Sequence, residues 1–252
     1  MEHVELDSRL SQLSTQWTML FQARNGTPEE VDKALAMLML RYSGAIHRYL
    51  FKAVGDPEVV EELDQEFALR FLQGKFLNFD PSRGRFRNYV KRAVRNLMID
   101  YYRRKDSARH LNTSMETAIV EESGLEEFER QFLTSWRDEL LDRTWKAMDD
   151  HERRTGEPYH KLLRFRVDHP ELHSPQMAEQ LSPLLGRSLT AGGVRQALLR
   201  ARNKFAEILI HEVQVSLKSP TRDEIEEELG ELKFLEYCQP VLKKLSSTEE
   251  QN

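Results

Sequence analysis

Arginine, lysine and asparagine recur along one stretch of the chain at spacings that suit binding to a polyanion. Between Pro81 and Arg109 there are ten Lys or Arg residues and two acids, which gives this stretch a net charge of +8. The periodicity predicts a helix from about Arg85 to Arg104 with one cationic ridge flanked by polar side chains. The ridge is Arg87, Lys91 and Arg95, and its flanks are Asn88, Arg92 and Asn96. Guanidinium, ammonium and amide groups are donors that bind phosphates and base edges, so this face is predicted to bind nucleic acid.

The opposite side of the same helix is apolar and is predicted to be buried. It carries Phe86, Tyr89, Val90, Ala93, Val94, Leu97 and Tyr101. An ordinary solvated face is the alternative interpretation of the polar side. Such a face usually mixes lysine with glutamate, and this one has no glutamate.

A second cationic stretch lies on a pattern typical of a helix-turn-helix. Arg187 to Lys204 holds five basic residues and no acid. A short helix from Ser174 to Leu181, with proline in its first turn, precedes a turn around Gly186. Thr190 then caps a longer helix, which buries Val194, Ala197, Leu198, Ala201 and Phe205 and exposes Arg195, Gln196, Leu199, Arg200, Arg202 and Asn203. In a helix-turn-helix the second helix enters the major groove, although the same pattern also arises by chance in helical bundles.

An acidic stretch of the chain is predicted to bind a cationic partner instead of a polyanion. Six acids lie between Asp56 and Glu66, and they would repel DNA. A basic protein surface is the expected partner, and a solvated acidic face is the alternative.

The elements that position these residues are helices, because no segment alternates regularly between apolar and polar residues. Helices are expected over 31–53, 57–73, 85–104, from Phe132 onward, and again before and within the helix-turn-helix. Of the 252 residues 31% are charged, mean hydropathy is −0.64, and net charge is −5, so a globular chain is predicted. Its length suits two small domains. Together with the helical periodicity, this predicts an all-α fold with two small domains. The longest apolar run has seven residues, too few to span a membrane. Cys238 is the single cysteine, so no internal disulfide can form, which favours the cytoplasm.

A metal-dependent hydrolase is an alternative from another class. His160, His169 and His173 lie near Glu157 and Glu171, and the last two histidines are spaced to share a helix face. Pro170 and Pro175 interrupt that face, so the sequence predicts neither a metal site nor another cofactor.

Three segments together resemble bacterial RNA polymerase sigma factors of the extracytoplasmic-function group. The segment Glu62-Leu63-Asp64-Gln65-Glu66-Phe67 resembles the polymerase-binding helix of that family. The stretch from Phe79 to Tyr89, continued from Ala93 to Tyr101, is similar to sigma region two. Val194-Arg195, Leu198 and Arg200-Ala201-Arg202 match the recognition helix of region four.

The resemblance implies a function without catalysis: binding polymerase core and directing promoter recognition, DNA opening and transcription initiation. The implied polymerase contacts are Glu62, Asp64, Gln65 and Glu66. The implied contacts to the minus-ten element are Lys75, Asn78, Arg83, Arg85, Arg87, Asn88, Lys91, Arg92, Arg95 and Asn96, and the loop Gly74–Gly84 would hold an unpaired base. The implied contacts to the minus-thirty-five element are Arg195, Gln196, Leu199, Arg200 and Arg202. The expected partners are polymerase core, promoter DNA and an anti-sigma or other regulatory protein.

The domains expected from this resemblance are joined by an acidic linker. They are an N-terminal extension at 1–27, region two at 28–105, the linker at 106–129, region four at 130–218 and a helical tail at 219–252. The tail either packs on region four or binds a regulator. A stand-alone helix-turn-helix regulator is the nearest alternative function, and it would not need the acidic helix.

Overall fold

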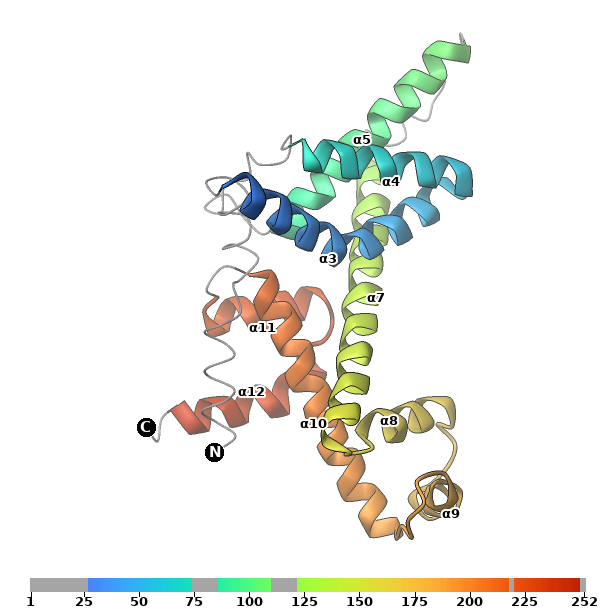
Figure 1. The fold of residues 1–252 in the computed structure, drawn as a ribbon, viewed down its shortest axis with the longest axis vertical. Helices are drawn as coiled ribbons and strands as arrows, with labels where there is room; N and C mark the ends of the chain where they lie inside the picture. Colours follow the sequence, from blue (N-terminus) through green and yellow to red (C-terminus); the bar gives the residue numbers. More distant parts are fainter. Residues whose placement is uncertain (1–26, 74–85, 110–121, 218–219, 250–252) are drawn as a thin grey trace. The chain divides into compact units, whose positions relative to one another are not determined.

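Every element that the structure describes is a helix, so the prediction of an all-α chain is confirmed (Figure 1). The computed structural model describes residues 27–73, 86–109, 122–217 and 220–249. The helices are α3 (Pro28–Val54), α4 (Pro57–Leu72), α5 (Phe86–Arg109), α7 (Glu122–Thr155), α8 (Tyr159–Asp168), α9 (Ser174–Leu184), α10 (Ala191–Ser216), α11 (Arg222–Glu231) and α12 (Leu235–Glu249). None of them is long and apolar enough to cross a membrane.

The chain forms two compact units. Unit 1 takes the described residues up to Glu139 together with Gln214–Pro220, and unit 2 takes Leu140–Val213 and the described residues from Thr221 onward. Helix α7 contributes its first half to unit 1 and its second half to unit 2.

Local sequence signals explain how α3 ends and α4 begins. Gly55 adopts φ 72°, a conformation that favours glycine, and it follows α3 directly. The Asp56 carboxylate then accepts a hydrogen bond from the Glu58 backbone N–H at 3.1 Å, and Pro57 occupies the first helical turn. These two signals reverse the chain, and α3 and α4 pack side by side (Figure 1).

The core of unit 1 is made by the apolar faces of α3, α4, α5 and the first half of α7. Its buried side chains include Ile46, Tyr49, Leu50, Leu63, Phe67, Val94, Leu97, Phe128, Phe132 and Trp136. Tyr49 of α3 lies edge-on to Phe128 and Phe132 of α7, with ring centroids 4.9 and 5.7 Å apart. Tyr42 stacks on Trp136 at 5.0 Å. Aromatic pairs of this kind add about 0.5–1.5 kcal/mol each beyond the area they bury.

These aromatic contacts differ from the expectation that residues up to 129 form a linker. Helix α7 already begins at Glu122, and Phe128 is only 6% exposed. The sequence around it is acidic, which suggested a solvated tether, but Phe128, Phe132 and Trp136 follow at intervals of four and bury against α3. The part of the predicted linker at 110–121 lies outside the described residues.

The buried positions of α7 continue at intervals of four along the helix. They are Phe128, Phe132, Trp136, Leu140, Thr144, Met148 and Glu152, and Ser135 beside Trp136 is buried as well. Because an α-helix has 3.6 residues per turn, a spacing of four makes the buried stripe wind around the helix. No single face of α7 is therefore apolar throughout, and its overall periodicity is weak.

Unit 2 packs α8, α9 and α10 around the second half of α7. Met148, Leu162, Met177, Leu181, Val194 and Ala201 are all at most 2% exposed. The C-terminal helices α11 and α12 belong to this unit and bury Ile225, Leu229, Leu232, Phe234, Cys238, Val241 and Leu242. The described chain after Pro220, up to Glu249, is thus a helical hairpin.

Replacing Phe128 by alanine tests whether the start of α7 is part of the unit 1 core. We expect Phe128→Ala to lower the free energy of unfolding by about 3 kcal/mol, because it removes a buried ring and leaves a cavity. Urea unfolding followed by circular dichroism measures the change. Phe51→Ala is the control, since Phe51 is 49% exposed and should cost well under half as much. Equal stability of wild type and Phe128→Ala would show that this segment is a tether after all.

Candidate nucleic-acid interface

The solvent-facing side of α4 is an acidic stripe. Val60, Leu63, Phe67 and Phe71 point into the core of unit 1. The stripe on the opposite side consists of Glu58, Glu61, Glu62, Gln65 and Leu69, all exposed. Its last member, Leu69, is 56% exposed, so the stripe ends in an apolar side chain. We call this surface the α4 stripe.

The four residues expected to bind polymerase do not all lie on the α4 stripe. Glu62 and Gln65 do, and Gln65 also donates a hydrogen bond to Glu61 at 3.4 Å. Asp64 lies beside the stripe and contacts His47 of α3, with Oδ2 2.5 Å from Nδ1. Burial raises the pKa of Asp64, and its hydrogen bond with His47 only partly offsets that rise.

Glu66 connects α4 to α5 instead of pointing straight into solvent. Arg70 donates to one carboxylate oxygen at 2.5 Å, and Arg104 of α5 donates to the other at 2.6 Å. Arg70 also donates to Asp100 of α5 at 2.9 Å. Partial burial raises the pKa of Glu66, but the hydrogen bonds from Arg104 and Arg70 lower it further, so it lies below its ordinary 4.5. The four charges form one network across the two helices.

The cationic ridge predicted on α5 is not its solvent face. Arg87 is 4% exposed, and the side chain of Lys91 is 21% exposed with its ammonium 2.8 Å from Glu129 of α7. Met98 and Tyr102, which the sequence analysis had not assigned to the apolar side, are buried. Glu129 of α7 pairs with Lys91, so α7 lies on the side of α5 that carries the ridge. The prediction of an exposed Arg87–Lys91–Arg95 ridge is therefore wrong at Arg87, which is buried, whereas Lys91 and Arg95 are half-buried.

The exposed strip of α5 consists of the former flanks and their continuation. Arg92 and Asn96 are exposed, as are Arg103 and Arg104 in the next turns, and Asn88 is half-buried. Arg103 is an exposed cation that the sequence did not predict: it lies beyond the predicted ridge, seven residues after Asn96 and on the same face. Lys75, Asn78, Arg83 and Arg85, together with the loop Gly74–Gly84, lie outside the described residues.

A groove of about 640 Å³ runs between α4 and α5, next to this strip. Its wall combines apolar side chains with amides and charges: Glu66, Leu69, Arg70, Gln73, Ala93, Asn96, Ile99, Asp100 and Arg103. Amides and guanidinium groups beside apolar carbon are suited to the edges and faces of bases.

Helices α9 and α10 of unit 2 form the predicted helix-turn-helix elements. The turn is closed by Ser182, whose hydroxyl accepts a hydrogen bond from the Leu189 backbone N–H at 3.0 Å, and Gly186 adopts φ 62°. Thr190 caps α10 by accepting from the Gly193 backbone N–H at 3.0 Å, as expected. A Cβ on Gly193 would lie 3.2 Å from the Thr190 hydroxyl, so glycine here leaves the cap room to close.

The five side chains expected to contact the minus-thirty-five element are exposed on α10. They are Arg195, Gln196, Leu199, Arg200 and Arg202. Leu199 is 59% exposed, while Val194, Leu198 and Ala201 on the other side are buried. The expected division of this helix into a buried and an exposed face is confirmed except at Ala197 and Asn203, which are half-buried.

A comparison with known protein families finds a match for part of the chain. Residues 38–108 match the family model of sigma-70 region 2. The matched residues include most of α3, all of α4 and nearly all of α5, and hence the α4 stripe, the Glu66 network and the exposed strip of α5. No curated protein and no solved structure matches the chain. The helices from α7 onward lie beyond the region 2 match.

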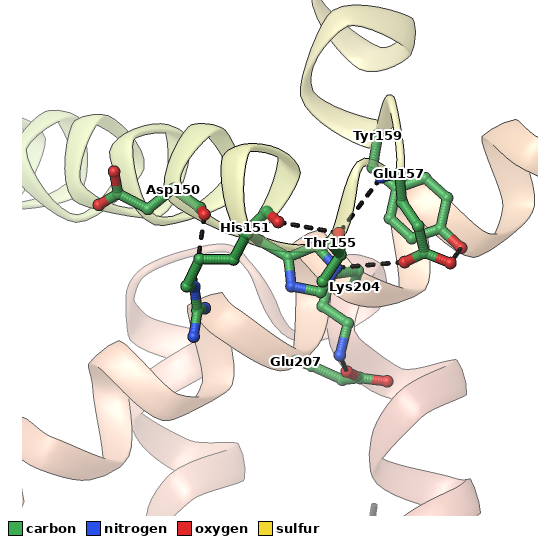
Figure 2. A network of polar contacts seen from close by, with 8 residues as sticks. Asp150, His151, Thr155, Glu157, Tyr159, Lys204 and Glu207 are labelled. Carbon is green, nitrogen blue, oxygen red and sulfur yellow. Dashed lines mark hydrogen bonds and ion pairs between the residues drawn. The ribbon is translucent and has the colours of Figure 1, made fainter.

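The described histidines His151, His160 and His169 each contact a neighbouring acidic or aromatic side chain. At the turn from α7 to α8, His151 Nε2 lies 3.3 Å from the Glu157 carboxylate, which also accepts from the Tyr159 hydroxyl at 3.0 Å (Figure 2). His160 lies edge-on to Trp145, and His169 lies 3.7 Å from Glu171. Among the residues that the structure describes, no group of three or more His, Cys, Asp or Glu side chains is placed to hold a metal.

Removing the charge of Glu66 tests the network in region 2. We expect Glu66→Gln to lower the free energy of unfolding by about 1 kcal/mol at pH 7, because two charge-assisted hydrogen bonds to arginine are weakened. The pKa of Glu66 is lowered by folding, so its stabilising contribution is present above about pH 4.5 and is lost as the pH falls through the folded-state pKa.

Urea unfolding of wild type and variant between pH 3 and pH 7 measures this dependence. Glu62→Gln, an exposed acid on the same helix, is the matched control and should leave stability unchanged within about 0.5 kcal/mol. A Glu66→Gln effect that stayed constant down to pH 3 would contradict the proposed origin of the stabilisation.

Proposed function

We propose that this chain is a sigma factor of the extracytoplasmic-function group, which binds RNA polymerase core and directs promoter recognition, DNA opening and transcription initiation. The observation that carries the proposal is the sigma-70 region 2 match at 38–108, which covers an acidic surface and a cationic surface on neighbouring helices. The group assignment rests on the resemblance of the segments 62–67, 79–101 and 194–202 in the sequence.

The charge distribution supports two different partners for region 2. The α4 stripe carries three glutamates and no cation, so it suits a basic protein surface and repels DNA. Helix α5 has eight Lys or Arg residues and two acids over Phe86–Arg109, which suits a polyanion. Binding of polymerase core to α4 and of DNA to α5 would match the charge of each surface.

The exposed strip of α5 is the surface we assign to the minus-ten element. Arg92 and Arg103 would contact phosphates, Asn96 a base edge, and the groove between α4 and α5 would flank an unstacked nucleotide. Opening about ten base pairs costs roughly 1.4 kcal/mol per step. A chain with a net charge of −5 is poorly suited to provide that free energy alone, so docking on polymerase is part of the proposed function.

Helix α10 is the surface we assign to the minus-thirty-five element. Arg195, Gln196, Leu199, Arg200 and Arg202 are exposed on it, and Arg and Gln side chains recognise guanine and adenine edges while Leu can contact a thymine methyl group. Under this proposal the chain acts in the cytoplasm, where chromosome and polymerase are located. An anti-sigma or other regulatory protein is a further proposed partner.

Charge reversal on the α4 stripe tests core binding. We expect Glu62→Lys to weaken binding to the RNA polymerase core of the encoding organism by at least about 10-fold, measured by surface plasmon resonance with immobilised core. Glu29→Lys reverses an exposed acid of unit 1 outside α4 and should bind as wild type does. Wild type that fails to bind core would instead support the stand-alone helix-turn-helix regulator.

Neutralising the exposed strip of α5 tests DNA opening. The double substitution Arg92→Ala and Asn96→Ala should leave core binding intact and reduce promoter opening by about 5- to 100-fold, because a phosphate contact and a base contact are lost. Permanganate footprinting of holoenzyme on genomic promoters measures the opening. Arg153→Ala removes an exposed cation of α7 and is the control. Undiminished opening by the double variant would remove α5 from the proposed strand-binding surface.

A further inference from the structure

The C-terminal hairpin α11–α12 belongs to unit 2, and hydrogen bonds cap both ends of α11. Thr221 caps α11 in a capping box with Glu224, and its hydroxyl accepts from the Glu224 backbone N–H at 3.3 Å. The turn into α12 closes by hydrogen bonds from the Lys233 and Phe234 backbone N–H groups to Gly230 and Leu229, at 3.0 and 2.8 Å. These caps set where α11 begins and ends.

The hairpin contacts α10 next to the surface that is proposed to read DNA. The Tyr237 hydroxyl of α12 donates a hydrogen bond to the backbone carbonyl of Arg202 at 3.3 Å. The Tyr237 ring lies edge-on to Phe205 of α10, with centroids 5.9 Å apart and planes at 90°. Burial raises the pKa of Tyr237 to about 12, so the hydroxyl keeps its proton at neutral pH and can donate.

Phe205 is held from a second helix as well. Trp145 of α7 lies edge-on to it at 4.8 Å, and Arg164 of α8 lies over the Trp145 ring at 4.0 Å. Phe205 is 6% exposed and sits one turn after Arg202 on α10. Side chains from α7 and α12 thus both contact α10 at Phe205, on the side opposite its exposed face.

The rotation of α10 matters for reading base edges. The exposed side chains of α10 from Arg195 to Arg202 span two turns, and a small rotation of the helix would move each of them relative to a base edge. Recognition groups need to be held within about 0.5 Å and 10–20° of their working geometry by the residues behind them.

We propose that the α11–α12 hairpin is a positioning element for the DNA-reading helix, acting through Tyr237 on Arg202 and Phe205. The inference rests on the proposed function, because it concerns the fidelity with which α10 reads the minus-thirty-five element. Tyr237 itself contacts α10 and not DNA, so it sets how selectively the upstream element is read and leaves the minus-ten element and core binding untouched.

The test uses full-length chain assembled with polymerase core and a DNA library randomised at both promoter elements. Transcripts are sequenced, and the preference at each element is the yield of the best sequences relative to the median. Tyr237→Ala removes both contacts, and Tyr237→Phe keeps the ring and removes only the hydroxyl. Leu245→Ala is the matched control, because Leu245 lies on the same helix and is 40% exposed, against 43% for Tyr237.

We expect Tyr237→Ala to reduce the preference at the minus-thirty-five element at least 5-fold, with the minus-ten preference and core affinity unchanged. Tyr237→Phe should retain at least half of the wild-type preference, and Leu245→Ala all of it. Amide hydrogen exchange of residues 194–204 should be faster in Tyr237→Ala and unchanged in Leu245→Ala.

Two results would overturn the positioning role. One is a Tyr237→Ala variant that keeps the wild-type preference at both elements. The other is an equal fall at both elements, which would mean that Tyr237 only supports the fold. Wild-type holoenzyme without preference at either element would instead overturn the proposed function, and the positioning role with it.

Discussion

The packing of α7 aromatic side chains on α3 determines which surfaces of the first unit are free to bind a partner. Phe128, Phe132 and Trp136 bury against Tyr42 and Tyr49, and this brings Glu129 within 2.8 Å of Lys91 on α5. Separating the helices would expose five large rings, at roughly 1.5–3 kcal/mol for each aromatic side chain. The side of α5 that carries Arg87 and Lys91 is therefore largely covered, and the strip with Arg92, Asn96 and Arg103 stays exposed.

The opposite charges on the exposed sides of α4 and α5 separate the two proposed partners. Acidic residues occupy the free side of α4 and cationic residues the free side of α5, while Glu66, Arg70, Asp100 and Arg104 neutralise one another between them. Opposite charges placed on neighbouring helices would otherwise attract the wrong partner to each surface. In unit 2 helix α10, which is proposed to read DNA, is exposed on one side and contacted on the other by Trp145 and Tyr237 through Phe205.

The sequence predicted much of this arrangement because its local signals were unambiguous. Proline at the start of α4, threonine before α10 and the spacing of Val194, Leu198 and Ala201 each predict a helix limit or a buried face, and the structure agrees. The prediction of an exposed ridge on α5 failed for a different reason. The spacing of apolar residues between Phe86 and Arg104 leaves open how much of the helix circumference is buried. Part of it is covered by α7, and the apolar residues of α7 wind around that helix, so the sequence did not place α7 in unit 1. Arg103 was missed for the related reason that it lies beyond the predicted ridge.

The central claim is that the two cationic surfaces select promoters only when polymerase core is bound. It is tested most directly by incubating sheared genomic DNA of the encoding organism with the chain alone, with core alone and with both, and sequencing the retained fragments. The account predicts that a small set of fragments is enriched only when chain and core are both present. Enrichment of the same fragments by the chain alone, or of none by the mixture, would contradict it.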